Sequence, residues 1–482
     1  MRRLGFSLFR FRAGLVSILL LTGCALTPDY QRPELDVPET FSAGRAQPIN
    51  LTQGDSIANL GWWEVFEDTQ LQRLIRSALL ENKDIDIALS RVAQANAQLT
   101  STRANQYPFF DITGSVGRGR QTQLLAPGAG VENSFSVMGN LSFDLDLWGE
   151  LSRSTESAQA SLLASEAVQR HVTLGIVANV ASAYFLLLDL DERVLIAQRT
   201  VDSRQSSLGI IQSRFEKGVV PELDLNQAQI ELAVAEVAVA TFQRQMAQVE
   251  NALALLLGRN PGPIDRGLSL KEQQLLPDIP TGLPSELLRR RPDVVAAEHT
   301  LHAETALIGV TEALRYPSLS LTGRYGAVSS ELSDLNNSGA KSWSVAGNIF
   351  APIFNWGQLK AQSDVQRARA EQALYAYEAT VQQAFREVAD ALVAVRTYRQ
   401  EYLAYRRQAA AARNAERLSQ ARYDAGVVDY LEVQDASRSL FAAELNESQS
   451  YQQVMTSLLE LYQALGGGWM PESADTSPRQ SP

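Results

Sequence analysis

Residues 134–148, which read SFSVMGNLSFDLDLW, decide the fold of this 482-residue chain. Their odd-numbered positions are apolar or glycine, whereas their even-numbered positions up to residue 146 are serine, asparagine or aspartate, apart from Met138. An alternation of this kind has the period of a β-strand and not that of a helix. The stretch therefore predicts a long strand with one apolar and one polar face.

Three further segments, 109–120, 318–328 and 342–354, are predicted to be strands of the same kind. The segments 121–133 and 329–341 are rich in glycine, proline, serine and asparagine, which predicts two hairpins. At about 9–11 residues per crossing, each strand is long enough to span an outer membrane. Four strands cannot close a barrel, because about eight is the practical minimum, so several copies must assemble. The alternative is a soluble β-sandwich, for which the rest of the chain supplies no further strands.

The chain is an internal duplication. Trp148-Gly149, Arg214-Phe215 with Gly218-Val219-Val220, and Leu257-Gly258 recur 208 residues later as Trp356-Gly357, Arg422-Tyr423 with Gly426-Val427-Val428, and Leu465-Gly466. Tyr107-Pro108 recurs 209 residues later as Tyr316-Pro317. Because order and spacing are preserved, we interpret the chain as two copies of one unit.

The remainder of each copy is predicted to be helical. No proline lies between Pro127 and Pro221 or between Pro352 and Pro471. Long helices are expected over 150–217, 222–257, 358–425 and 428–465, with glycine turns at Gly218 and Gly426. The longest would extend about 100 Å and must pack beside others. Shorter helical stretches, 62–104 and 284–314, precede the strands.

The first residues predict export and lipidation. A basic start and the apolar run 13–21 lead to Leu21-Thr22-Gly23-Cys24, which resembles a bacterial lipobox. Cys24 is the only cysteine, so disulfides within the chain and cysteine-based zinc sites are excluded. Several acyl chains on Cys24 would anchor the protein stably, and Ala25 in the next position favours the outer membrane. The alternative is an ordinary signal peptide with an incidental cysteine.

The charge and hydropathy of the chain argue against nucleic-acid-binding proteins and against proteins that span a membrane with helices. The net charge is −11, and removal of the first 23 residues, which carry four arginines and no acid, makes it −15. Nucleic-acid binding is not expected of so acidic a chain. After residue 23 we find no run of about 18 apolar residues, so a transmembrane helix is not expected and any spanning element must be a β-barrel.

The motifs resemble the TolC- and OprM-like outer membrane factors, the outer membrane efflux protein family, in its lipoprotein (NodT-type) branch. The elements that carry the resemblance are Trp62-Trp63, Leu283-Pro284-Ser285-Glu286-Leu287-Leu288-Arg289-Arg290-Arg291-Pro292-Asp293, Leu321-Thr322-Gly323 and Phe354-Asn355-Trp356-Gly357. The resemblance implies a mixed α and β membrane protein: a trimeric 12-stranded β-barrel, four strands per chain, continued by a periplasmic α-helical barrel. Implied partners are outer membrane lipid, a periplasmic adaptor, and an inner membrane transporter of the resistance-nodulation-division type.

The resemblance also implies roles for particular residues. The helix–turn–helix tips, Gly218-Val219-Val220 and Gly426-Val427-Val428, would contact the adaptor; the alternative is a buried glycine-capped turn. Leu431, Glu432 and Asp435 would line a periplasmic gate, in which threefold symmetry makes each acid a ring of three; the alternative is a solvated helix start. Tyr423 and Asp224 match two positions of the family's closed-state lock, but Val428 replaces its arginine, so a different lock is expected.

Enzyme signals are weak. His299 and His302 are three apart on a predicted helix and could chelate a metal, but they lack the zincin spacing, so a solvated polar face is expected instead. We find no nucleophile elbow, phosphate loop or dinucleotide fingerprint, and expect neither enzyme activity nor a cofactor.

The sequence thus predicts the outer membrane channel of a tripartite efflux pump, passively conducting drugs or other small toxic compounds. The alternatives are a type I secretion channel and a periplasmic coiled-coil scaffold without a pore. The predicted segments are a signal peptide (1–23), a lipid-anchored tether (24–61), repeat 1 (62–258), a linker (259–283), repeat 2 (284–466) and a disordered tail (467–482).

Overall fold

The computed structural model describes residues 30–34, 66–120, 130–273 and 284–467. The predicted signal peptide, Cys24, most of the tether, and the tail from residue 468 onward lie outside the described residues. The chain divides into two compact units. Unit 1 comprises Met1–Glu34, Arg91–Glu166 and Ala296–Glu378, and unit 2 comprises Leu35–Ser90, Ala167–Val295 and Ala379–Pro482.

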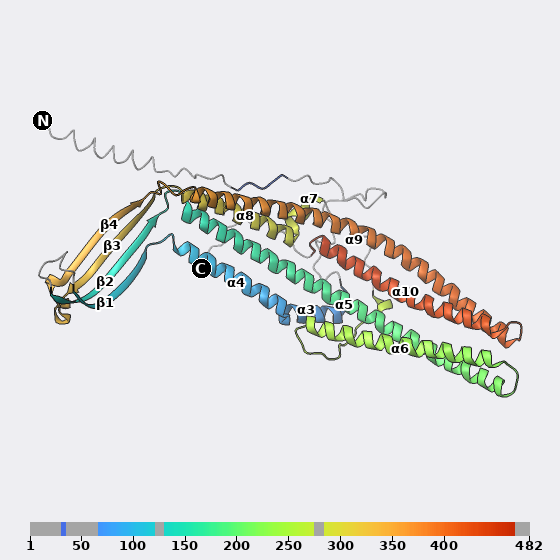
Figure 1. Cartoon of the computed structure of the whole chain (residues 1–482). Helices are drawn as coiled ribbons and strands as arrows, with labels where there is room; N and C mark the ends of the chain where they lie inside the picture. Colours follow the sequence, from blue (N-terminus) through green and yellow to red (C-terminus); the bar gives the residue numbers. More distant parts are fainter. Residues whose placement is uncertain (1–29, 35–65, 121–129, 274–283, 468–482) are drawn as a thin grey trace, which may run out of the picture. The chain divides into compact units, whose positions relative to one another are not determined.

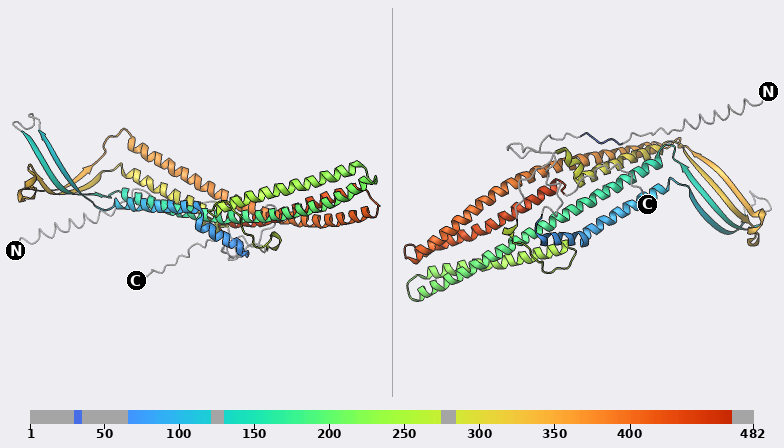
Figure 2. Two further views of the ribbon diagram at one scale, coloured as in Figure 1. Left: turned by 90° about the horizontal axis from the view of Figure 1, so that it is seen from below. Right: turned by 180° about the vertical axis from the view of Figure 1, so that it is seen from behind.

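Unit 1 contains one antiparallel sheet of four strands in the order β1-β2-β3-β4 (Figures 1 and 2). The strands are β1 (Phe109–Arg120), β2 (Val131–Leu145), β3 (Ser318–Ser329) and β4 (Lys341–Phe350). β1 pairs only with β2 and β4 only with β3, so within the described chain both outer strands leave an unpaired edge. The expected number of strands and their hairpin pairing are confirmed.

The register places the apolar side chains of all four strands on one face, because side chains alternate along a strand. One row across the sheet consists of Ile112, Gly139, Tyr325 and Trp343. The neighbouring row on the other face is polar and consists of Asp111, Asn140, Arg324 and Ser344. The apolar side chains are uncovered: Ile112 is 71% and Trp343 74% exposed.

Three strands differ in their bounds from the prediction, β3 only by ending at Ser329 instead of residue 328. β2 spans Val131–Leu145 where 134–148 was expected, and β4 spans Lys341–Phe350 where 342–354 was expected. The early end of β4 precedes Pro352, which lacks the N–H that a ladder needs. β2 ends before Asp146, whose carboxylate instead accepts hydrogen bonds from the amides of Leu151 (3.0 Å) and Ser152 (2.8 Å). Asp146 thus accepts hydrogen bonds from the first turn of the following helix rather than extending the strand.

The long helices have nearly the expected bounds. They are α5 (Glu150–Glu216), α6 (Glu222–Leu256), α9 (Gln358–Asp424) and α10 (Tyr430–Ala464). α10 begins two residues later than expected because Asp429 is its N-cap, accepting from the amide of Glu432 (3.3 Å). Each duplicated helix has the length of its counterpart, 67 residues for α5 and α9 and 35 for α6 and α10.

The shorter helical stretches are each broken in two. The first divides into α3 (Thr69–Glu81) and α4 (Lys83–Ala104), because the Asn82 side chain accepts from the amides of Asp84 and Ile85 and so starts a new helix. The second divides into α7 (Pro284–Arg290) and α8 (Pro292–Ala313), since proline is favoured at a first helical position. A 3-10 turn, η2 (Leu270–Glu272), lies between the repeats.

One described helix, α5, has an 18-residue window apolar enough to cross a membrane, with a mean hydropathy of 1.7. More than half of that window, 56%, is buried inside the chain, as is usual for a helix in a protein core. This apolar window was not expected from the sequence.

Candidate functional site

Two helix–helix turns in unit 2 have the same backbone geometry, one between α5 and α6 and the other between α9 and α10. Gly218 and Gly426 both have φ of +72°, a left-handed conformation that glycine adopts without strain. Each glycine amide donates to the carbonyl three residues earlier (2.8 and 2.9 Å), and the next amide donates to the carbonyl five residues earlier (2.9 Å in both). Such a pair of bonds ends a helix as a Schellman motif. The duplication therefore extends to individual hydrogen bonds.

Each turn exposes one valine and partly buries the next. Val219 is 69% and Val427 68% exposed, whereas Val220 and Val428 are half-buried. Beneath the turns lies a small apolar cluster, here called the tip core. It consists of Ile211, Ala228, Tyr430 and Val433, with Leu208, Val220, Leu225 and Tyr423 packed against it. Because its members come from α5, α6, α9 and α10, the tip core joins the two helical hairpins.

The predicted gate residues lie at the start of α10. Leu431 is 53% exposed and Asp435 is also exposed, and no ion pair to Asp435 is found in the described part of the chain. Glu432 has a partner: Arg422 Nη1, on α9, donates to its Oε1 at 2.7 Å. The charge of Glu432 is therefore offset within one chain, a contact that sequence reasoning did not anticipate.

The two residues that match the family's lock are not bonded to each other among the residues described. Tyr423 packs between the Arg214 guanidinium, 4.9 Å above its ring, and the Tyr430 ring, 5.5 Å away. Its hydroxyl is buried without a hydrogen bond in the described structure. Asp224 is half-buried near the start of α6. Arg422, one residue before Tyr423, is instead the cation that joins α9 to α10.

Sequence reasoning also missed a buried ion cluster near the tip core. The guanidinium of Arg204, on α5, is 6% exposed and lies 3.0 Å from the Glu231 carboxylate on α6. Arg438 on α10 approaches the same carboxylate at 3.3 Å, and Phe441 lies under Arg204 at 5.4 Å. Burial lowers the pKa of Arg204, opposed by the charge of Glu231. These contacts hold α10 against the α5–α6 hairpin.

The histidine pair does not lie on a simple solvated face, so that expectation is wrong for His302. Its ring stacks on Tyr30 (centroids 4.5 Å apart), and its Nε2 lies 2.9 Å from Oε1 of Glu156. One turn earlier on α8, Glu298 pairs with Arg32 at 2.8 Å. Residues 30–34 thus dock on this helix in unit 1, which no local pattern could predict. No group of three or more metal-ligating side chains occurs among the described residues.

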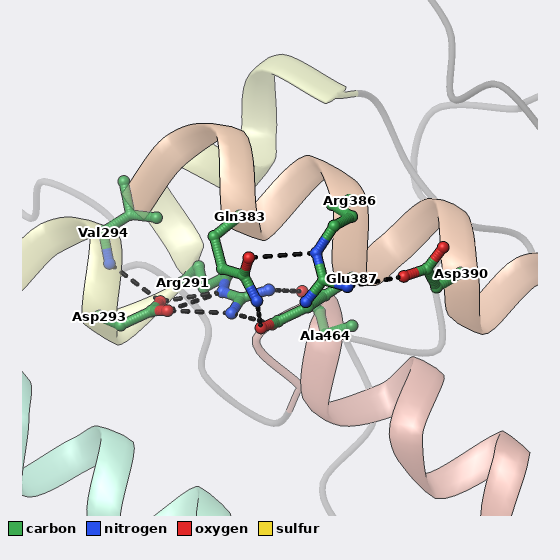
Figure 3. Close-up of polar contacts among 8 residues, drawn as sticks. All are labelled: Arg291, Asp293, Val294, Gln383, Arg386, Glu387, Asp390 and Ala464. Atoms are coloured by element: carbon green, nitrogen blue, oxygen red, sulfur yellow. Dashed lines mark hydrogen bonds and ion pairs between the residues drawn. The ribbon is translucent and has the colours of Figure 1, made fainter. Parts of the chain in front are cut away.

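The basic motif before α8 has a structural role in unit 2 (Figure 3). The Arg291 guanidinium, 7% exposed, donates to both oxygens of Asp293 at 2.9 Å and to the carbonyl of Ala464 at 3.2 Å. It also pairs with Glu387 on α9. This one side chain therefore joins the start of α8 to α9 and to the end of α10.

The sequence is similar to that of known outer membrane proteins over nearly its whole length. The sequence pattern of the family described as "Outer membrane efflux protein" matches residues 74–259 and 283–467. The chain is 36% identical to the cation efflux system protein CusC of Escherichia coli K12 over 456 residues, 93% of this chain and 97% of that one. It is 36% identical to the outer membrane protein OprJ of Pseudomonas aeruginosa over 472 residues, 95% of each chain.

Solved structures agree with these matches. The open-state MtrE outer membrane channel of Neisseria gonorrhoeae superposes with a TM-score of 0.84 at 33% identity, covering 93% of this chain and 99% of that one. The CmeC outer membrane channel of Campylobacter jejuni gives 0.86 at 26% identity, covering 93% and 96%.

Proposed function

Because the chain belongs to the outer membrane efflux protein family, we propose that three copies form one conduit through the outer membrane and into the periplasm. The protein is an outer membrane channel component of an efflux system. The observation that carries the proposal is the four-stranded sheet, with one uncovered apolar face and two unpaired edges. Exposed backbone at a sheet edge has no partner in lipid, so the edges must meet other copies. Three copies supply twelve strands.

Outer membrane lipid is proposed to contact two parts of the molecule. The apolar face of the sheet, with Ile112, Val116, Trp343, Val345 and Ile349 each more than 70% exposed, suits contact with acyl chains. Acylated Cys24 would add an anchor in the same membrane. Growth with labelled palmitate should label the protein, and Cys24→Ser should abolish labelling.

The two turns are proposed to contact a periplasmic adaptor, which links the channel to an inner membrane transporter of the resistance-nodulation-division type. Val219 and Val427 support this role, because a pair of large apolar side chains about 70% exposed at equivalent turns suits an apolar partner surface. Val220 and Val428 are half-buried and would support the turns from beneath.

The start of α10 is proposed to be the gate. Leu431 and Asp435 are four residues apart on one exposed face, so three copies would place three leucines and three carboxylates around the pore. Glu432 contributes less repulsion because Arg422 pairs with it. Asp224 and Tyr423 would act with Arg422 in holding the closed arrangement, in place of an arginine at position 428.

The cargo is proposed to be small toxic compounds. Drugs, solvents and metal cations are all candidates within this class. The relatives are named for different cargoes: CusC for cations, and TtgC of Pseudomonas putida for toluene. A type I secretion channel and a scaffold without a pore are the competing functions.

Single-channel recording in planar bilayers tests the proposal. The purified wild-type oligomer should show little conductance, and the Asp435→Ala, Glu432→Ala double variant should conduct more, because alanine fills less of the pore than either acid and cannot pair with Arg422. Glu236→Gln, an exposed acid on α6, is the control and should behave as wild type. An absence of conductance in the double variant would favour the scaffold.

A further inference from the structure

A tryptophan joins the two repeats where their strands meet. Trp148, just after β2, donates from Nε1 to the carbonyl oxygen of Pro317, just before β3, at 2.7 Å. Its ring packs against Tyr316 with centroids 5.1 Å apart. This contact adjoins the β2–β3 pairing, so it links repeat 1 to repeat 2 within one chain.

The duplicated counterparts of this contact are unpaired. Trp356 corresponds to Trp148 and is 88% exposed; among the described residues its one ring contact is with Phe354, 4.6 Å away. Tyr107 corresponds to Tyr316 and is 65% exposed. Trp356 also has φ of +52°, the one positive value at a non-glycine position among the described residues. A left-handed tryptophan is unfavourable unless surrounding contacts hold it, and the described part of one chain supplies none beyond Phe354.

The β3–β4 hairpin has the same pairing register as the β1–β2 hairpin. Moving β1 forward by 209 residues and β2 by 208 converts the pair Phe110↔Leu141 into Leu319↔Ile349, which is the pair found between β3 and β4. The pair Ser115↔Ser136 likewise becomes the observed Arg324↔Ser344. The hairpins of the two repeats therefore have one common register.

We propose that β4 of one copy pairs with β1 of a second copy in the register of β2 with β3, and that Trp356 docks on Tyr107-Pro108 of that second copy. This inference rests on the trimer proposed above and specifies its seam. The same displacement converts Leu141↔Gly323 into Ile349↔Gly114, and Gly139↔Tyr325 into Gly347↔Val116. The indole N–H of Trp356 would donate to the carbonyl oxygen of Pro108, as that of Trp148 does to Pro317.

The side chains along this seam fit one another. Odd-numbered residues of β4 and even-numbered residues of β1 form the apolar face, and the proposed register pairs odd with even throughout. Two large residues meet a glycine, Ile349 facing Gly114 and Val116 facing Gly347, and further along the seam Val345 and Trp343 face Arg118 and Arg120. The same alternation occurs inside the chain, where Leu141 faces Gly323 and Tyr325 faces Gly139. A shift by one residue would place the polar face of β1 against the apolar face of β4.

Cysteine cross-linking of the full-length protein in outer membranes tests the register. Directly paired antiparallel residues have Cα atoms about 4.5–5.5 Å apart, within the range of a disulfide. A Cβ at Gly114 meets nothing closer than 4.0 Å, so cysteine fits there. Ile349→Cys with Gly114→Cys should give disulfide-linked dimers and trimers on oxidation. Ile349→Cys with Val116→Cys, two residues out of register, should link at least fivefold more slowly.

Controls separate this inference from the proposed function. Leu141→Cys with Gly323→Cys should link within one chain and give no linked oligomer, and each single cysteine variant reports any linkage through Cys24. Faster linkage of the out-of-register pair, or no linkage in a protein that still forms conducting trimers, would overturn the seam while the channel function stands. Loss of both trimer and conductance in the wild-type protein would overturn the channel proposal as well.

Two tryptophan variants test the docking without any cysteine. Trp356→Phe keeps a ring but loses the N–H, and loss of one hydrogen bond of about 1 kcal/mol should speed dissociation of the trimer in detergent about fivefold. Trp148→Phe, which removes the equivalent bond inside one chain, should change dissociation less than twofold. Tyr107→Ala should speed dissociation further when added to Trp356→Phe, because it removes the ring contact that phenylalanine keeps. Equal effects of the two phenylalanine variants would overturn the docking.

Discussion

At the level of single residues, the ion pair between Arg422 and Glu432 adds to the contacts that hold α10 against α9 at the tips. The side chains are 54% and 37% exposed, so water screens the pair. Pairs of this kind contribute roughly 0.2–1 kcal/mol. That is small enough to be broken when α9 and α10 separate, and large enough to bias a channel between two states. The pair could not be predicted from the sequence, because ten residues and a turn separate its members.

Removing either charge of this pair should favour opening. We expect Arg422→Gln and Glu432→Gln each to raise the open probability of reconstituted channels by up to about fivefold, which corresponds to about 1 kcal/mol. The double variant should show no further increase, because both changes remove one interaction. Arg386→Gln on α9 is the control, since it removes a comparably exposed pair with Asp390 away from the tips. Fully additive effects would contradict the assignment.

Arg291 presents the opposite case, because its guanidinium is almost completely buried. Arg291→Ala would leave the carboxylates of Asp293 and Glu387 without their cation and the Ala464 carbonyl without a donor (Figure 3). Breaking a buried pair in this way typically costs about 3–5 kcal/mol. We expect a clear fall in the unfolding midpoint of the helical circular dichroism signal. Arg386→Ala, exposed in the same region, should lower it little. A similar midpoint for both variants would contradict this role.

At the level of elements, periodicity and turn chemistry predicted most of the secondary structure. The strands follow from alternation, and the long helices from uninterrupted composition between prolines. The breaks in the shorter helices were missed although their signals were present: Asn82 is a good N-cap residue and Pro292 a favourable first helical residue. The docking of Tyr30 on His302 could not be found, because the two lie 272 residues apart and no local pattern connects them.

The two glycine turns allow a direct test of their geometry. Gly218→Ala or Gly426→Ala must hold an alanine at φ near +72°, which costs about 1–2 kcal/mol. We expect faster amide hydrogen exchange at the affected turn and weaker capture by a matching adaptor. Gly209→Ala is the control, since this glycine lies inside α5 with open space around it, and alanine there should stabilise the helix by about 0.5–1 kcal/mol. Loosened turns in that variant would contradict the explanation.

At the level of the whole molecule, the sheet explains why one chain is insufficient. Its interior pairings are complete, but its two outer edges and its apolar face are uncovered. The sequence predicted this state from strand count alone, because four strands fall short of any closed barrel. The number of copies does not follow from the count, since two chains would already supply eight strands. The family resemblance implies three.

The mass of the intact oligomer therefore tests the central claim most directly. Native mass spectrometry of the protein, extracted from outer membranes in mild detergent, should give one species of three chains, which separates into single chains as the detergent is made harsher. A stable single chain, or a closed pair with eight strands, would contradict the account.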